Sequence, residues 1–264
     1  MMKAAVLGSP ISHSLSPLLH RTAYEKLNFA GSYEALEVNE ESFPIRIQEL
    51  LDLGFSNFSL TMPLKEIGSS VADFIDEDSR RINSVNTLYK ESGSIQATST
   101  DLMAFKSLLK KVEFESVAII GGGGTARAAV GALAKRVGSI DLLIRDQKRL
   151  SALKIAGDGI AIKGLPLDSD ISNYDLVIAT TPSGVTDLLA EKLNSVKGLL
   201  IESLYKPYPT DLLKKWQVLG GRTLSGLDLL VEQALYQISI FTGIDYDFAT
   251  MRELLLSTGL KQLI

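Results

Sequence analysis

The chain has 264 residues, with 27 lysines and arginines against 31 aspartates and glutamates, and a formal net charge of −4. Its 45% hydrophobic and 22% charged residues are typical of a globular protein with one large domain or two ordinary ones. The acidic balance lacks the basic footprint of proteins that bind nucleic acid or an anionic membrane. There is no cysteine, which excludes disulfides, thiolate nucleophiles and cysteine metal ligands. His13 and His20 are the only histidines, which disfavours a zinc site or a histidine-based triad.

We expect no targeting signal at the start of this sequence. The apolar part of Met1–Gly8 is too short for a signal peptide, and no apolar run approaches the roughly 18 residues of a membrane span. We therefore expect a cytoplasmic protein that acts on a small molecule, with no nucleic-acid, membrane or metal partner. A monomer and a homodimer are both open.

The first segment is predicted to be a strand, Lys3–Gly8, followed by a polar loop. Pro17 then opens a helix to about Leu27, with Ser16 as its N-cap. Ser14 and Ser16 therefore stand beside a helix N-terminus, where partial positive charge and free N–H groups favour a carboxylate or phosphate. Ordinary capping by Ser16 is the alternative interpretation.

The next candidate is Lys65, which follows a break at Met62–Pro63 and lies at the start of a predicted helix. A cation at a helix N-terminus opposes the macrodipole, so this placement indicates a functional role, against the alternative of a solvated surface lysine. The preceding segments are predicted to form a strand, a helix and a strand: Ser32–Val38, Ser42–Leu53 and Phe55–Thr61. The following ones are predicted to form a hairpin and a helix: Ser84–Tyr89 with Ser94–Thr98, and about Leu102–Lys111.

A glycine-rich turn lies at the middle of the chain. The apolar run Val117–Ile120 predicts a buried parallel strand, and an alanine-rich helix follows the turn. Gly121, Gly123 and Ala126 fit the G-x-G-x-x-G/A pattern of dinucleotide-binding folds. Without side chains at these positions, the N–H groups of the loop and of the first helical turn can reach a pyrophosphate. The alternative is a tight strand–helix turn that binds nothing.

The strand Ile140–Ile144 completes a strand–helix–strand unit and ends at Arg145 and Asp146. This position contacts the adenosine ribose in dinucleotide-binding folds. Arg145 indicates a 2′-phosphate and hence NADP, whereas Asp146 indicates a 2′-hydroxyl and hence NAD. We give Arg145 more weight because it comes first after the strand, so NADP is expected and NAD remains the alternative.

The fold class is predicted to be α/β with two domains. Further strands are expected at Tyr174–Thr180, Gly198–Glu202 and Arg222–Leu224, then a long helix from Ser225–Gly226 to about Thr242 and a last one from Tyr246 to about Ser257. Because the alternation of strand and helix then stops, the last helices are expected to return to the first domain. The prediction is an N-terminal α/β substrate domain, 1–101 completed by 226–264, and a Rossmann-type dinucleotide-binding domain, 102–225, with a cleft between them.

Seven segments, in order along the chain, resemble those of the shikimate dehydrogenase family, and the glycine loop lies among them. They are Gly8–His20, Ser59–Lys65, Ser84–Leu88, Ser99–Asp101, Thr180–Gly184, Tyr205–Thr210 and Gly226–Ala234. The resemblance implies reversible reduction of the ketone of 3-dehydroshikimate to shikimate with NADPH, in the biosynthesis of chorismate and the aromatic amino acids. It also implies that Lys65 and Asp101 form the catalytic pair. The residue types agree, because a lysine ammonium can stabilise the developing alkoxide and supply its proton, and a neighbouring aspartate favours the charged lysine.

The resemblance implies further site residues by position. It places Ser14 and Ser16 at the substrate carboxylate, with help from Tyr205. It places Thr61, Asn86 and Gln233 at the substrate hydroxyls. At the cofactor it places Gly121, Gly122, Gly123, Gly124 and Thr125 on the pyrophosphate, Arg145 and Arg149 near the adenosine phosphate, and Gly226 by the nicotinamide.

The chain departs from the family pattern at several positions. Many members carry Asn at the position of Ser59, Gly or Ala at that of Ser84, and Asn at that of Ser99. Ile144 and Asp146 replace an Asn and a Thr that usually flank the arginine. The changes around the arginine bear on NADP preference. A quinate/shikimate or aminoshikimate dehydrogenase is the alternative enzyme, and a non-catalytic binding protein is the alternative from another class. The paired lysine and aspartate argue against the latter.

Overall fold

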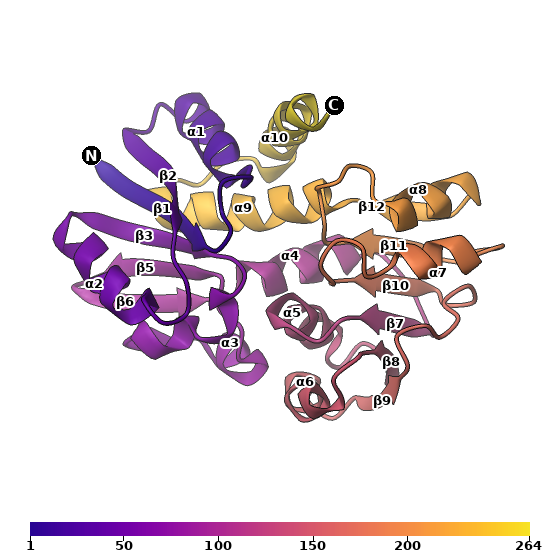
Figure 1. Cartoon of the computed structure of the whole chain (residues 1–264). Coiled ribbons are helices and arrows are strands. Elements are labelled where there is room, and N and C mark those ends of the chain that lie inside the picture. The colour runs from indigo at the N-terminus through magenta and orange to yellow at the C-terminus, as the bar shows by residue number, and fades with distance from the viewer. The chain divides into compact units, whose positions relative to one another are not determined.

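The computed structural model describes residues 1–264, and the chain divides into two compact units (Figure 1). Unit 1 consists of Met1–Ala104 and Val231–Gln262, and unit 2 of Phe105–Leu230 with Leu263–Ile264. The divisions fall within three helices, α4 (Thr100–Leu109), α9 (Gly226–Thr242) and α10 (Phe248–Leu263). None of the helices combines the length and the apolar character that crossing a membrane requires.

Unit 1 is built on a six-stranded mixed sheet. In order across the sheet its strands are β2 (Gly31–Glu37), β1 (Met2–Gly8), β3 (Phe55–Leu60), β5 (Thr87–Glu91), β6 (Ser94–Thr98) and β4 (Phe74–Ile75). β1 runs parallel to both of its neighbours, whereas β5 is antiparallel to β3 and to β6. The predicted hairpin is therefore confirmed, with Ser92 and Gly93 turning at positive φ as a two-residue hairpin loop requires.

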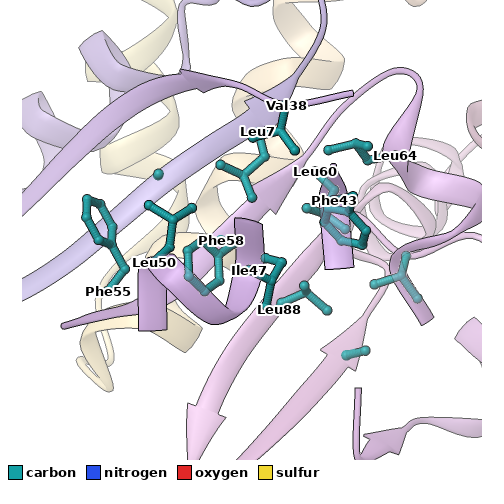
Figure 2. Close-up of a cluster of buried hydrophobic side chains, with 13 residues drawn as sticks. Leu7, Val38, Phe43, Ile47, Leu50, Phe55, Phe58, Leu60, Leu64 and Leu88 are labelled. Carbon is teal, nitrogen blue, oxygen red and sulfur yellow. The ribbon is translucent and has the colours of Figure 1, made fainter. Parts of the chain in front are cut away.

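The two faces of this sheet differ because successive side chains along a strand point in opposite directions. Phe58 and Leu60 of β3 point to one face, which α2 (Phe43–Asp52) covers with an apolar cluster shown in Figure 2. Ser59 lies between them and points to the other face, where its hydroxyl meets the side chain of Gln237 on α9. The apolar face stabilises the unit, and the polar face carries the candidate site.

Unit 2 is built on a six-stranded parallel sheet. Its strands, in order across the sheet, are β12 (Arg222–Leu224), β11 (Leu199–Glu202), β10 (Leu176–Ala179), β7 (Val117–Ile120), β8 (Ser139–Leu143) and β9 (Ala161–Leu165). If β7 to β12 are numbered 1 to 6 and the sheet is followed from β9 to β12, the order is 3-2-1-4-5-6, as in dinucleotide-binding folds. The switch point of such a sheet lies between strands 1 and 4, here β7 and β10. The predicted α/β class with a Rossmann-type sheet is confirmed.

Helices of unit 2 cover this sheet (Figure 1). Ala118 and Ile120 of β7 join an apolar cluster with residues of α7 (Asp187–Lys192) and α8 (Asp211–Val218), in which Trp216 is fully buried. α5 (Gly124–Leu133) packs on β7 and on α6 (Leu150–Ala156). The short apolar strands are thus buried, as their continuous hydrophobic runs predict.

The remaining helices complete the two units. They are α1 (Ser16–Lys26), α3 (Glu77–Ile82) and α10 (Phe248–Leu263), with the 3-10 turns η1 (Leu64–Glu66), η2 (Gly68–Val71) and η3 (Gln147–Arg149). Two predicted helix boundaries are wrong. α4 begins at Thr100 rather than Leu102, because the backbone N–H of Thr100 bonds the side chain of Asn86, and α10 runs on past Ser257 to Leu263.

Candidate active site

The two predicted catalytic residues form an ion pair in unit 1. Lys65 Nζ lies 2.5 Å from Asp101 Oδ2, and the two side chains are 18% and 5% exposed. Lys65 lies on η1, one turn beyond β3, and Asp101 lies in the first turn of α4, where a carboxylate is favoured. The expectation that Lys65 opposes a helix dipole is wrong, because η1 is only three residues long and the nearby carboxylate compensates the charge.

Asn86 connects this pair to the rest of the polar face. Its side-chain oxygen, Oδ1, accepts from Thr100 N at 2.7 Å and lies 3.2 Å from the Thr87 hydroxyl. Because a backbone N–H can only donate, this contact fixes which way the amide points. The amide nitrogen then donates to Asp101 Oδ1 at 3.0 Å and to Gln233 Oε1 at 3.2 Å. Four predicted residues, Lys65, Asn86, Asp101 and Gln233, are therefore joined by direct contacts.

Ser14 and Ser16 lie at the start of α1, but the expected capping is wrong. Ser16 is the first helical residue, the N-cap is Leu15, and no side chain caps the helix there. Instead Ser14 Oγ accepts from Ser16 N at 3.3 Å, and the Ser16 side chain lies near the phenol of Tyr33. Ser16 is buried and Ser14 is half-buried.

Thr61 follows the end of β3, and its position depends on a glycine. A Cβ built on Gly8 would lie 2.3 Å from Thr61 Cγ2, so only glycine at the end of β1 leaves room for this side chain. The backbone N–H of Thr61 donates to Leu7 O at 2.9 Å, which extends the pairing of β1 and β3 by one bond.

The two histidines have different environments. His20 is fully buried, stacks on Tyr33 with ring centroids 3.9 Å apart, and bonds Ser16 O through Nδ1 at 2.9 Å. Burial lowers the pKa of His20 to about 4, and its ring therefore stays neutral at physiological pH. His13 is exposed.

Sequence reasoning missed three buried residues on the same face of the sheet. Tyr33 Oη donates to Ser59 Oγ at 2.6 Å, and Ser59 Oγ donates to Gln237 Oε1 at 2.8 Å. Gln237 Nε2 in turn donates to Asn86 O at 3.1 Å and to Thr87 Oγ1 at 2.9 Å. One signal was available, because Gln237 comes one helical turn after Gln233 and interrupts the same apolar helix.

In unit 2 the glycine-rich turn has the conformation that its sequence predicts. Gly121 has φ +113°, and a Cβ there would lie 2.5 Å from Thr180 Oγ1. Gly123 is the N-cap of α5 and offers no side chain to the N–H groups of the first turn, which begins at Gly124. A helix start without a capping side chain suits an anion, so these residues fit the pyrophosphate of a dinucleotide.

The residues after β8 bear on the choice between NADP and NAD. Asp146 Oδ1 accepts from Lys148 N at 3.0 Å and so caps η3. Arg149 Nη1 donates to Gly122 O at 3.2 Å, which places a guanidinium against the glycine turn, and Arg145 is exposed. Because the carboxylate is engaged by its own turn and the Arg149 guanidinium lies against the glycine turn, these residues fit a 2′-phosphate better than a bare 2′-hydroxyl.

Tyr205 and Gly226 also lie in unit 2. Tyr205 is half-buried on the loop that follows β11, and Gly226 begins α9. Glu202 anchors this loop: its Oε1 accepts from Leu204 N at 3.2 Å and its Oε2 from the Thr210 hydroxyl at 3.1 Å. Burial raises the pKa of Glu202 to about 7.

A Rossmann-type unit with an uncapped glycine-rich helix start, and a unit carrying an ammonium–carboxylate pair among amides and hydroxyls, define a dinucleotide-dependent oxidoreductase. The chain belongs to the shikimate dehydrogenase family. The family model for the shikimate dehydrogenase substrate binding domain matches residues 6–88, and that for the shikimate 5′-dehydrogenase C-terminal domain matches residues 226–256.

Relatives and solved structures agree over nearly the whole chain. The chain is 32% identical to a shikimate dehydrogenase (NADP(+)) of Pyrococcus abyssi over 94% of each chain, and 30% identical to that of Halothermothrix orenii over 90% of each. The crystal structure of Mycobacterium tuberculosis shikimate dehydrogenase has a TM-score of 0.85 at 30% identity, covering 97% of this chain and 99% of that one. The Thermus thermophilus enzyme in complex with NADP(H) and shikimate has a TM-score of 0.84 at 29% identity, covering 98% and 100%.

Proposed function

We propose that this protein catalyses the reversible reduction of 3-dehydroshikimate to shikimate with NADPH, a step of aromatic amino-acid biosynthesis. The observation that carries the proposal is the Lys65–Asp101 pair, held in place by Asn86 on the polar face of the unit 1 sheet. The names of the relatives and the shikimate and NADP(H) bound by the Thermus thermophilus enzyme support it.

The two units take separate tasks in this proposal. Residues 1–101 with 226–264 form the substrate domain, and residues 102–225 form the cofactor domain. The polar face of the unit 1 sheet and the family model that matches residues 6–88 support the first assignment. The parallel sheet order and the glycine turn of unit 2 support the second.

The substrate residues divide by what they bind. Ser14 and Ser16, at the start of α1, donate hydroxyls to the substrate carboxylate, and Tyr205 assists at that end. Thr61, Asn86 and Gln233 bond the substrate hydroxyls. Hydroxyls and amides of this kind fix the orientation of a polyhydroxylated ring, because a substrate group that is missing leaves a buried polar partner unpaired.

The proton chemistry belongs to Lys65 and Asp101. The Lys65 ammonium stabilises the negative charge that develops on the ketone oxygen, and the pair supplies the proton that turns the alkoxide into a hydroxyl. Asp101 orients the ammonium, since its carboxylate accepts from Lys65 on one oxygen and from Asn86 on the other. In the direction of oxidation the same pair accepts the proton from the substrate hydroxyl.

The cofactor residues lie in unit 2. Gly121, Gly122, Gly123, Gly124 and Thr125 hold the pyrophosphate, Arg145 and Arg149 the adenosine 2′-phosphate, and Gly226 borders the nicotinamide. NADPH supplies the hydride when it is bound there. The uncapped start of α5 and the contact of Arg149 with Gly122 support this assignment.

The test is a spectroscopic assay of NADPH oxidation with 3-dehydroshikimate, for the wild type and for Lys65→Ala. The wild type should turn over with NADPH in preference to NADH, and with shikimate in preference to quinate in the reverse direction. Lys65→Ala should lose kcat by roughly a thousandfold or more with shikimate affinity nearly unchanged, because the lost contact acts mainly in the transition state. A Lys65→Ala enzyme with near-native turnover would refute this mechanism.

A further inference from the structure

We propose that Gln237 is a positioning residue for this reaction, which acts through a buried hydrogen-bond relay from Tyr33 to the Asn86–Asp101 contact. The inference rests on the proposed function and adds to it a residue outside the predicted site. All members of the relay lie in unit 1.

The relay begins with three buried side chains from three different elements. Tyr33 on β2, Ser59 on β3 and Gln237 on α9 are 1%, 4% and 1% exposed. Tyr33 Oη lies 2.6 Å from Ser59 Oγ, and Ser59 Oγ lies 2.8 Å from Gln237 Oε1. These lengths are those of good O–H···O bonds, and the burial leaves no bulk water to replace any of them.

The direction of each bond follows from one backbone group. Gln237 lies 3.1 Å from Asn86 O, which can only accept, so the Gln237 amide nitrogen faces it and the Gln237 oxygen faces Ser59. Ser59 must then donate to Gln237 and accept from Tyr33. Burial raises the pKa of the Tyr33 phenol, so it keeps the proton that it donates.

On its other side the relay reaches the catalytic pair. Gln237 Nε2 also donates to Thr87 Oγ1 at 2.9 Å, which turns the Thr87 hydroxyl proton away from Gln237. Two acceptors then face this proton, Asn86 Oδ1 at 3.2 Å and Thr100 Oγ1 at 3.1 Å, and Thr100 Oγ1 itself lies 3.1 Å from Asn86 Oδ1. Asn86 Oδ1 thereby gains a donor beside Thr100 N, and its amide nitrogen is left to face Asp101 Oδ1 at 3.0 Å.

Loss of the Gln237 amide should therefore disturb Asn86 on two sides. The Asn86 backbone carbonyl loses a donor, and Thr87 loses the partner that orients its hydroxyl. A buried polar group left without a partner relaxes toward another one, and an active-site group misplaced by about 1 Å can lower the rate a hundredfold. Because Ser14, Ser16 and Thr61 bind the substrate outside the relay, and Asn86 is displaced rather than removed, the effect should fall on kcat more than on substrate affinity.

The first experiment compares Gln237→Leu with Gln48→Leu. Gln48 is exposed on α2 and bonds only Asp52 among the side chains around it, so this control makes the same change at the surface of unit 1. Gln237→Leu should lower kcat about tenfold or more, with shikimate affinity from calorimetry changed less than about threefold, whereas Gln48→Leu should match the wild type. The Asn86 side-chain amide resonances should shift only in Gln237→Leu.

The second experiment tests the directional donation itself. Ser59 and Thr87 are direct cross-strand partners in the register of β3 and β5, so an asparagine at position 59 brings an amide beside Thr87. Gln237→Ala should lower kcat as Gln237→Leu does, and the pair Ser59→Asn with Gln237→Ala should recover part of it. This recovery is not expected of a residue that only fills space in the core.

The outcomes separate the relay from the proposed function. A folded Gln237→Leu enzyme with wild-type kcat and an unchanged Asn86 resonance would overturn the relay, and so would a loss of kcat that follows the unfolded fraction in a thermal melt. A double variant no faster than Gln237→Ala would overturn the directional donation. If the wild type itself fails to oxidise NADPH with 3-dehydroshikimate, the proposed function fails, and the Asn86 resonance still reports on the relay. Should Gln237→Leu not fold, Gln237→Met, which keeps the length of the side chain and removes the donor, takes its place in the same measurements.

Discussion

Gly226, the first residue of α9, lies directly against the backbone of Leu204. A Cβ built on Gly226 would be 2.2 Å from the carbonyl carbon of Leu204 and 2.3 Å from its oxygen. Leu204 belongs to the loop that follows β11 and carries Tyr205. The start of α9 and this loop can thus approach each other only because position 226 has no side chain.

Gly226→Ala should therefore displace the loop or the helix start. The added methyl group meets backbone atoms, which cannot rotate away, so we expect a loss of unfolding free energy of about 1–3 kcal/mol and a marked loss of activity. Urea unfolding and the NADPH assay measure the two effects. Gly138→Ala is the matched control, because a Cβ at Gly138 has nothing within 4 Å, and it should leave both quantities unchanged. Equal stability of the two variants would contradict the packing argument.

Cofactor choice should depend on Arg149 more than on Asp146. Arg149→Ala removes a guanidinium from the glycine turn, and a charge-assisted bond to a phosphate is worth about 1.5–3 kcal/mol, or roughly 10- to 100-fold in affinity. NADPH affinity should fall by this factor while NADH affinity changes little. Calorimetric titration with both cofactors measures it.

Two controls accompany the cofactor prediction. Lys148→Ala removes an exposed cation one position away and should have a smaller effect. Asp146→Ala should leave the preference for NADPH in place, because the Asp146 carboxylate caps η3 through Lys148 N. If Asp146→Ala changed the affinity for NADPH and not that for NADH, this carboxylate, and not the arginine, would set the preference.

Stability should fall with rising pH because of Glu202. Its pKa is raised by burial from the ordinary 4.5 to about 7, so between these values the folded protein holds a proton that the unfolded chain has released. The contribution is fully present below pH 4.5 and is lost as the pH rises through about 7. The free energy of unfolding falls by about 3 kcal/mol in total, because a change of one pKa unit corresponds to about 1.36 kcal/mol.

Glu202→Gln isolates this effect from the other carboxylates. Glutamine keeps the acceptor for Leu204 N and cannot ionise, so the stability of the variant should lack the decline that the wild type shows between pH 4.5 and 7. Unfolding in urea across this range gives the difference between the two curves. Parallel curves for wild type and variant would mean that Glu202 ionises in the folded state as readily as in the unfolded chain.

The features that sequence alone predicted well are local. The glycine turn between β7 and α5 was predictable because the apolar run, the glycines and the helix-forming alanines are consecutive, and each sets its own backbone conformation. The hairpin of β5 and β6 was predictable for the same reason. The Lys65–Asp101 pair was predicted from chemistry and resemblance, and the two residues, 36 positions apart, are indeed in contact.

The expected cap of α1 is the clearest misassignment. Ser16 has the sequence position of a cap, but it is the first helical residue, and its side chain is buried near Tyr33, which only the packing of β2 against α1 brings close. Between Arg145 and Asp146 the sequence favoured the arginine and hence NADP, and in the structure a backbone N–H two residues on engages the aspartate.

The sequence by itself determined the alternation of strands and helices, the glycine-rich turn and the residue types available for proton transfer, because these depend on neighbours within a few positions. Only the tertiary structure decided the partners of Asn86, since Gln237 lies 151 residues away and reaches it by the return of α9 to the first sheet. A buried amide takes its orientation from every polar group around it, and around Asn86 those groups come from the adjacent Thr87, from Thr100 and Asp101 on α4, and from Gln233 and Gln237 on α9.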